Sequence, residues 1–492
     1  MRLNLDGHPY TSRSIIASNQ RRINLYGEQN KDPQAPVPYT EYPTPGSTLF
    51  GTPNVEGSSR GFYRTSLNTA YEVIGTNLYF LASNGAMVLV GTVTDRPSQI
   101  IMSDNGIVLV LVDGVQGWAV DLATNTFGEI IDPAFYGADF VVFLDTFFIF
   151  NRPDTNQFYI SLALVTYAML TGGTGFDPLD IAAKSGSPDY IVGIATVHKE
   201  LWLIGQITTE VWIGTGAADF YFQLQQGAYI DHGCAAPYSI ASQDVIIFWI
   251  MQDKQGSGIV VKGANYQTEE ISTPAIVAEF KSYATMADAI GTCLQIADHA
   301  WYVISFPTAN KTWIYDLTIN EWSEWVWLNI DDGTFNRHRL NNAAFVYGKN
   351  LISDWETGKV LELSINTFTD LNSDDEENPI PCLRTFMHIV GQKYERVSYL
   401  NFDADMEVGT SPQIDLSLGE ELPQISLSWS DNKGKTFGDP VMQTLGNQGD
   451  YLTTLSWNRL GSARDRVFKL QWSANLKTAL NGVFIELLPH RS

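Results

Sequence analysis

The sequence predicts an all-β protein in which a β-propeller of six or seven blades is followed by an antiparallel β-sandwich, with an extended N-terminal arm. Three observations support this fold class. Charged residues make up only 17% of the 492 residues and aromatics 12%, a composition that favours sheets over helical bundles. Short apolar runs alternate with turns along residues 61–380, in units spaced by about 40 to 50 residues. From residue 381 onward, apolar and polar residues alternate within the runs.

Residues 1–60 predict an extended arm with little core of its own. The segment is polar and is interrupted by prolines, among them Pro33, Pro36, Pro38, Pro43, Pro45 and Pro53. A chain of this kind lies along the following domain or wraps around a neighbour. Two adjacent cations, Arg21 and Arg22, are candidate contact residues within the arm.

Residues 61–380 predict the propeller, because seven hairpin units of short apolar strands follow one another there. Radial repetition of small antiparallel sheets accounts for many short strands without long exposed edges. In residues 118–127 and 312–322 a strand ends in aspartate and is followed by a turn with threonine and asparagine (Thr124-Asn125 and Thr318-Ile319-Asn320) and an aromatic residue. A large sandwich and a β-helix are the competing architectures. Residues 273–296 have helix-compatible spacing and indicate a helical insertion or an irregular blade.

Residues 381–492 predict a separate antiparallel sandwich of about 100 residues. The expected strands are residues 398–403, 424–430, 452–457, 467–473 and 482–488. We therefore divide the chain into an arm (1–60), a propeller (61–380) and a sandwich (381–492).

The net charge of −24 resides in the propeller segment, which has 13 basic and 37 acidic residues. This balance excludes a basic nucleic-acid-binding module, whose affinity for phosphate depends on Lys and Arg. Many acids stand alone at turns, as Asp113, Asp121 and Asp316 do, and are typical of solvated or turn-capping carboxylates. One true cluster exists, Asp374-Asp375-Glu376-Glu377, and it is typical of an exposed loop or linker.

No pattern predicts a catalytic residue, a cofactor site or a metal site. Gly434-Lys435-Thr436 imitates the end of a phosphate-binding loop, but Trp429 stands where the first glycine is required. The seven histidines lack metal-ligand spacing, and three distant cysteines make no disulfide framework. The N-terminus has no signal-peptide core and the apolar runs are too short to span a bilayer, so we expect a soluble protein made in a cytoplasm.

Residues 430–437 form a motif with an alternative meaning. They resemble the Asp-box turn of sialidases and of many non-enzymatic β proteins, with Asn432 and Phe437 at two of its positions. A propeller glycosidase or sialidase-like enzyme is therefore one alternative function, although a single copy outside the propeller disfavours it. A glycan-binding receptor module is another, with tryptophans as stacking platforms; Trp322, Trp325 and Trp327 could form an exposed ridge, but core packing explains them better.

Several segments, taken in their order along the chain, resemble a known family. They are residues 20–28, 59–64, 71–81, 209–216, 227–241 and 271–276. Together they resemble the packaged-DNA stabilisation proteins, which are the tail hub or nozzle proteins of short-tailed bacteriophages. The resemblance is scattered over residues 20–365 and is weakest towards the C-terminus.

The resemblance implies a non-enzymatic structural protein of the virion tail, made in the host cytoplasm. It implies a ring of six subunits below the portal and its adaptor, which retains the packaged genome and forms the channel for its ejection. The implied partners are the other subunits, the portal and adaptor proteins, and a tailspike, fibre or needle on the sandwich. Double-stranded DNA would pass through the lumen without sequence-specific binding.

The two charged features gain candidate roles from this resemblance. The acidic loop of Asp374, Asp375, Glu376 and Glu377 is a candidate channel-facing element, because carboxylates at a lumen repel phosphate and lower friction. The Arg21-Arg22 pair is a candidate contact to an adjacent subunit or to an acidic adaptor surface.

Overall fold

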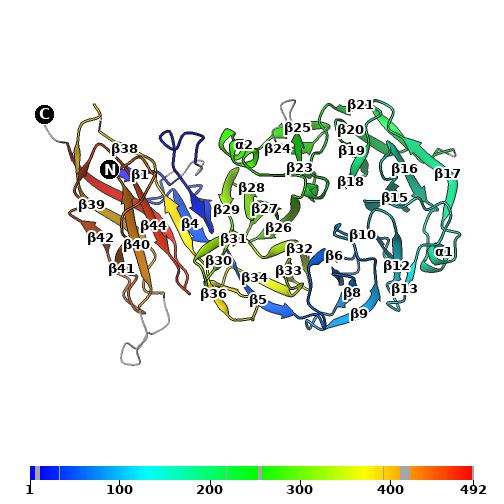
Figure 1. The fold of residues 1–492 in the computed structure, drawn as a ribbon, viewed down its shortest axis with the longest axis horizontal. Coiled ribbons are helices and arrows are strands. Elements are labelled where there is room, and N and C mark those ends of the chain that lie inside the picture. The colour runs from blue at the N-terminus through cyan, green and yellow to red at the C-terminus, as the bar shows by residue number, and fades with distance from the viewer. Residues whose placement is uncertain are drawn as a thin grey trace.

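The structure, a computed structural model, describes residues 1–5, 11–32, 34–217, 219–252, 258–391, 393–410 and 422–489. Within these ranges the chain is nearly all β, and a ring of radial sheets stands beside a two-sheet sandwich (Figure 1). The predicted all-β class, with a propeller followed by a sandwich, is therefore confirmed. The helical elements in these ranges are α1 (Tyr167–Thr171), α2 (Pro274–Lys281) and the 3₁₀ turn η1 (Pro237–Ser239).

Six propeller blades are built from consecutive strands, with the innermost strand first. Blade 1 has β6 (Ser59–Arg64), β7 (Ala70–Ile74), β8 (Asn77–Leu81) and β9 (Met87–Thr92). Blade 2 has β10 (Ile101–Asp104), β11 (Val108–Val112), β12 (Gly117–Asp121) and β13 (Phe127–Glu129). Blade 3 has β14 (Val141–Leu144), β15 (Phe147–Asn151), β16 (Gln157–Ser161) and β17 (Phe176–Ala183).

The next three blades follow the same order. Blade 4 has β18 (Ile191–Val197), β19 (Glu200–Gly205), β20 (Thr209–Gly214) and β21 (Phe222–Ile230). Blade 5 has β22 (Ala241–Gln243), β23 (Ile246–Gln252), β24 (Gly258–Ala264) and β25 (Gln267–Glu270). Blade 6 has β26 (Ile290–Ile296), β27 (His299–Phe306), β28 (Lys311–Asp316) and β29 (Glu321–Glu324).

A seventh blade closes the ring with strands from two distant parts of the chain. Its strands are β32 (Leu340–Val346), β33 (Lys349–Asp354), β34 (Val360–Ser364) and β5 (Gly46–Gly51). β5 pairs antiparallel with β34 and is the outermost strand of the blade. Six of the seven blades are separate four-stranded sheets, whereas blade 6 continues into a ten-stranded sheet.

The alternation of apolar residues explains how the blades pack. In β11, Val108, Val110 and Val112 are buried in the core between blades 2 and 3. Leu109 and Leu111 of the same strand point the other way, into the core between blades 1 and 2. A strand covered on both faces by neighbouring blades therefore consists of apolar residues throughout.

The repeated Asp–Thr–Asn motif occupies the same turn of two blades, between the third and fourth strands. Asp121 Oδ1 accepts backbone N–H bonds from residues 123 and 124, and Asp316 Oδ1 accepts one from residue 318. Asn125 and Asn320 then take positive φ angles of 56° and 57°. Asparagine tolerates this left-handed conformation better than most residues do, which explains its place in the motif.

The sandwich consists of two sheets. The first contains β3 (Leu25–Gln29), β4 (Tyr39–Pro43), β45 (Leu480–Pro489), β39 (Val397–Met406) and β42 (Leu455–Asn458), with β1 (Arg2–Leu3) and β43 (Ser462–Ala463) beside them. The second contains β37 (Cys382–Thr385), β44 (Asp465–Trp472), β40 (Gln424–Ser430) and β41 (Val441–Thr444), with β38 (Ile389–Val390) on β44.

Two further hairpins are β30 (Val326–Asn329) with β31 (Thr334–Arg337), and β35 (Thr369–Leu371) with β36 (Glu377–Pro379).

A two-residue strand from the N-terminus joins the two domains. β2 (Arg22–Ile23) pairs parallel with β29 of blade 6 and antiparallel with β37 of the sandwich. The blade 6 sheet and the second sandwich sheet thereby become one sheet of ten strands. A continuous hydrogen-bonded sheet across the junction resists bending between the domains.

The structure distributes the first 60 residues over both domains, whereas the sequence indicated a separate arm. Strands β1, β3 and β4 belong to the sandwich, β2 bridges the domains and β5 closes the propeller. Two of the prolines fit this arrangement because they lie at strand ends: Pro43 ends β4 and Pro45 precedes β5. Of residues 273–296, only the first third is helical: α2 precedes blade 6, and β26 begins at Ile290.

Candidate functional site

The acidic cluster lies at the turn of the β35–β36 hairpin, and its four carboxylates are exposed. The Asn372 side chain organises the turn, because its Oδ1 accepts backbone N–H bonds from Asp374 (3.0 Å) and Glu376 (2.8 Å). Its amide group also donates to Glu376 at 3.2 Å. Glu377 accepts a bond of 3.2 Å from Asn475 of the sandwich. The cluster therefore has a defined shape and touches both domains.

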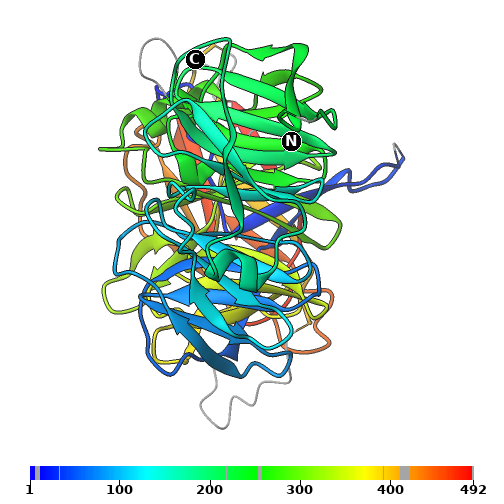
Figure 2. The same ribbon diagram turned by 90° about the vertical axis from the view of Figure 1, so that its right-hand side faces the viewer.

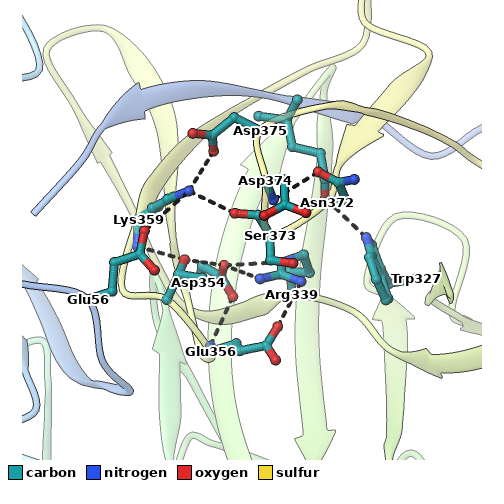
Figure 3. Close-up of polar contacts among 12 residues, drawn as sticks. Glu56, Trp327, Arg339, Asp354, Glu356, Lys359, Asn372, Ser373, Asp374 and Asp375 are labelled. Atoms are coloured by element: carbon teal, nitrogen blue, oxygen red, sulfur yellow. Dashed lines mark hydrogen bonds and ion pairs between the residues drawn. The ribbon is translucent and has the colours of Figure 1, made fainter.

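One of the four carboxylates is paired with a nearly buried cation (Figure 3). Lys359 Nζ lies 2.8 Å from Asp375 Oδ1, donates to the Ser373 carbonyl at 2.9 Å and lies 3.4 Å from Glu56. Burial alone would lower the pKa of Lys359, but Asp375 and Glu56 outweigh it and raise that pKa. Asp375 is thus ion-paired, whereas Asp374 and Glu376 are exposed and form no ion pair with another described residue.

A second ionic group holds the base of the hairpin (Figure 3). Arg339 lies 2.5 Å from Asp354 and 3.0 Å from Glu356. Its guanidinium also stands over the Trp327 ring, 5.2 Å from the centroid. The Trp327 indole N–H donates to the Leu371 carbonyl at 3.1 Å, which ties β35 to β30 of the other hairpin. These contacts therefore fix the position of the acidic turn.

Arg22, a candidate contact residue, is fully buried at the domain junction. Its Nη1 lies 2.7 Å from Glu321 of blade 6 and 3.8 Å from Glu41 of the sandwich, and it donates to the Tyr39 hydroxyl at 2.6 Å. Arg384 Nε lies 3.1 Å from the same Glu41. Arg22 is thus engaged within its own chain.

The buried junction cluster consists of Arg22, Arg384, Glu41 and Glu321, two cations against two carboxylates. Burial by itself would lower the pKa of Arg22, but Tyr39, Glu321 and Glu41 outweigh it and raise that pKa. Burial raises the pKa of Glu41, and the two arginines oppose this shift. A balanced cluster of this kind tolerates burial only while every member is present.

Arg21, the other candidate, is partly exposed and lines a cleft formed by residues 11–22, α2 and blade 6. It lies 2.5 Å from Glu324, which Lys311 also contacts at 3.0 Å. Burial would raise the pKa of Glu324, but these two cations lower it below its ordinary value. The cleft measures about 360 Å³ and is lined by residues from β2, β28, β29 and α2.

Sequence reasoning missed the residues that make the junction. Glu41, Glu321 and Arg384 are buried charges, and Asn24 is fully buried with a positive φ of 52°. Asn24 accepts from the Val326 N–H at 2.8 Å and donates to the carbonyls of Val326 (3.0 Å) and Pro381 (3.1 Å). A sequence signal for a buried charge is an ionisable residue within a mostly apolar strand, and Arg384 fits this pattern.

The other motifs have structural explanations. In the Asp-box-like turn, Ser430 Oγ accepts from the Gly434 N–H and Asn432 Oδ1 from the Thr436 N–H, both at 2.9 Å. Trp322 and Trp325 are buried. Among the described residues, no group of three or more His, Cys, Asp or Glu side chains is placed to hold a metal ion. Over the same part of the chain, no helix has the length and apolarity needed to cross a membrane.

Comparison with protein families decides what kind of protein this is. The family model for the β-propeller of bacteriophage P22 Gp10 matches residues 39–368, and the model for the β-sandwich of the same protein matches residues 385–487. The chain belongs to the bacteriophage P22 Gp10 family. It is therefore a phage stabilisation or tail hub protein, a structural component of the virion tail, as the sequence resemblance implied. The propeller match begins at residue 39 and so includes β5, the N-terminal strand that closes the ring.

Likeness to solved structures is confined to the fold. The extracellular domain of BT4673 from B. thetaiotaomicron is 8% identical, with a TM-score of 0.42; the match covers 65% of this chain and 40% of that one. Kuenenia stuttgartiensis hydrazine synthase is 10% identical, with a TM-score of 0.39 and coverage of 64% and 97%. The N-terminal domain of Nup159 is 9% identical, with a TM-score of 0.37 and coverage of 70% and 99%. The comparison with curated proteins gives no match.

Proposed function

We propose that six copies of this chain form a ring below the portal and adaptor of the phage, which retains the packaged DNA and later conducts it outward. The observation that carries the proposal is the match of both domains to one phage tail protein, in the same order along the chain. The family is structural, and we propose no catalytic step.

The cavity at the axis of the propeller is too small for DNA, which supports a channel formed between copies of the chain. The cavity there is about 160 Å³ and is lined by the apolar residues Phe62, Ile100, Phe140 and Ile290 among others. Such a volume has room for a few water molecules or a small ligand, and the residues that line it come mainly from the innermost strands of several blades. A duplex therefore cannot thread one propeller, and a conduit needs a ring of subunits.

The charge of the chain suits a conduit. The net charge of −24 would be multiplied in a ring, and phosphates would be repelled from walls of that sign. Salt screens this field over roughly 10 Å, so the repulsion acts only on DNA that approaches the wall closely. We propose that Asp374, Glu376 and Glu377 face the lumen, and that the portal, the adaptor and a tailspike, fibre or needle are the protein partners.

Electron microscopy of the purified chain, alone and mixed with its portal–adaptor complex, tests the proposal. We expect six-fold rings whose central opening admits a duplex. Monomers in both samples would overturn it.

A further inference from the structure

The sandwich is nearly neutral as a whole, with 11 basic and 12 acidic residues, but one of its ends is basic. Seven basic and three acidic residues lie in three of its turns, 391–396, 431–436 and 459–466. Tyr394 of the first turn contacts the other two: its carbonyl accepts from Arg464 at 3.1 Å, and its ring centroid lies 5.9 Å from Lys433 Nζ. The three turns therefore lie together, and we call them the basic end.

The cations of the basic end are available to a partner. Five of them are exposed and form no ion pair with another described residue: Lys393, Arg396, Lys435, Arg459 and Arg464. Two of the three acids in these turns are already paired. Asp431 binds the buried Arg466 at 2.6 and 2.7 Å, and Asp465 lies 2.7 Å from His388. Since the chain as a whole carries a charge of −24, this uncompensated patch favours an acidic partner.

A pocket of the opposite charge lies in the propeller, at the loops of blades 3, 4 and 5. It measures about 180 Å³, and the residues that line it include Asp139, Asp154, Tyr190, Gln206 and Tyr238. Neither carboxylate forms an ion pair with another described residue. Burial raises the pKa of Asp139 against the hydrogen bond from Asn151, and the charges of Asp154 and Asp113 add to the rise. A cation from outside would relieve this uncompensated negative charge.

Large apolar side chains are exposed on the same face of the propeller. Tyr190 is 46% exposed and Ile207 66%, on loops joined by a bond of 3.0 Å from the Gln206 N–H to the Tyr190 carbonyl. Val115 (55%) and Tyr136 (36%) lie on the corresponding loops of blades 2 and 3. An acidic pocket beside exposed apolar side chains is typical of a protein contact, in which a cation enters the pocket and the apolar surface is covered. We call this surface the pocket face.

The pocket face and the basic end lie far apart in one molecule. Blades 2 to 4 are on the side of the propeller away from the sandwich (Figure 1), and a view onto the propeller end shows the sandwich behind the propeller (Figure 2). The ten-stranded sheet fixes the two domains relative to each other. The basic end therefore cannot reach the pocket of its own chain, whereas a second copy brings both surfaces in equal number.

We propose that the basic end of one copy docks on the pocket face of the next copy, with one exposed cation in the pocket of Asp139 and Asp154. Opposite charges select this pairing, because two propellers repel each other. The contact joins two different surfaces, and such head-to-tail contacts generate rings when the rotation closes. The proposal rests on the ring proposed above and names the contact that builds it.

A double-mutant cycle tests the contact. Gln206→Lys places a cation at an exposed position of the pocket, and Arg396→Glu/Lys435→Glu removes the charge excess of the basic end. We would measure, by electron microscopy with the portal–adaptor complex, the protein concentration at which six-fold rings form. Each variant should need about tenfold more protein than the wild type. In the chain with all three substitutions, Gln206→Lys should add almost nothing to the effect of the other two, because the charge that it repels is gone.

Two controls separate this contact from net charge. Gln223→Lys makes the same change at an exposed position on β21, the outermost strand of the same blade, and Arg64→Glu/Lys199→Glu reverses two exposed cations of the propeller. Both should form rings at the wild-type concentration. Effects that simply multiply in the triple variant, or equal ring formation by all variants, overturn the contact and leave the ring intact. Absence of rings even for the wild type with its adaptor refutes the ring and the contact together.

Discussion

Arg22 and Glu321 form an ion pair of 2.7 Å that joins β2, the strand between the two domains, to blade 6 of the propeller, although the two residues are 299 positions apart in the sequence. Both side chains are buried, and Glu41 and Arg384 complete a neutral cluster around them. The pair sits where β2 is inserted between β29 and β37. The N-terminal strand is therefore held between the domains by backbone pairing and by buried charge.

Arg22→Met is expected to destabilise the protein strongly. The substitution leaves Glu321 and Glu41 buried with one cation between them, and breaking a buried pair costs about 3–5 kcal/mol. Chemical denaturation measures the loss, with Lys477→Met as the control, because Lys477 and Glu407 form an exposed pair. The control is expected to change stability by less than about 1 kcal/mol. A similar small change for both variants would show that the cluster does not hold the junction.

Asn24→Ala should weaken the same junction for a different reason. Alanine loses the three bonds to Val326 and Pro381, and it must also adopt a φ of 52°. We expect a loss of about 2–4 kcal/mol, since left-handed backbone alone costs an alanine about 1 kcal/mol. Asn24→Gly removes the bonds but not the conformational freedom, so it should lie between alanine and wild type. A glycine variant less stable than the alanine variant contradicts this account.

Features of the fold that depend on residues close together in the sequence could be predicted, whereas features that depend on distant residues could not. Hairpin units, turn aspartates and the Asp–Thr–Asn motif are local, so Asp121 and Asp316 were found where the structure has them. The pairing of β5 with β34 joins residues more than 300 positions apart in the sequence. Neither strand carries a local signal of that partner, which is why residues 1–60 were expected to form an arm.

The candidate site shows the same limit. The exposed state of Asp374 and its neighbours follows from a run of like charges, which cannot be buried together. The prediction that Arg22 contacts another subunit or the adaptor depends on an arm that lies outside the domains and on the usual exposure of arginine. Its burial depends on Glu41, Glu321 and Arg384, which come from three distant segments. No spacing rule within the sequence connects these four residues.

Glu72 should make the stability of the propeller fall as pH rises. It is fully buried in β7, and neither carboxyl oxygen has a hydrogen-bond partner among the described residues. Burial, with a contribution from Asp354, raises the pKa of Glu72 well above 4.5. A raised folded-state pKa gives stability that is full below pH 4.5 and is lost as pH rises towards the folded-state pKa.

Glu72→Gln tests this dependence, because a glutamine stays neutral. Urea denaturation between pH 5 and 8 should show the wild type losing up to about 1.4 kcal/mol per pH unit relative to the variant. Glu129→Gln, on an exposed position, is the control and should follow the wild type. Parallel curves for wild type and Glu72→Gln would mean that Glu72 is not held neutral.

Two of the three thiols, Cys234 and Cys382, are buried and should not react in the folded protein, whereas Cys293 is half-buried. Burial raises the pKa of Cys234 to about 12, and it raises the pKa values of Cys293 and Cys382 as well. Only the thiolate is an effective nucleophile, so a disulfide reagent at pH 8 should titrate at most one thiol, that of Cys293, until denaturant is added. Rapid labelling of a second thiol in the native chain would show that a buried site opens readily.

Charge reversal in the acidic turn should slow genome ejection if these carboxylates face the lumen. In Asp374→Lys/Glu376→Lys two repulsive charges become attractive to phosphate, whereas the pair of Asp375 with Lys359 is kept. Both positions are exposed, so stability should change by less than about 0.5 kcal/mol. Phage carrying the variant should eject DNA severalfold more slowly at low salt, and the difference should shrink as salt screens the contact. Glu129→Lys has the same change of sign on an outermost strand, so equal slowing by both would locate the effect in net charge and not in this turn.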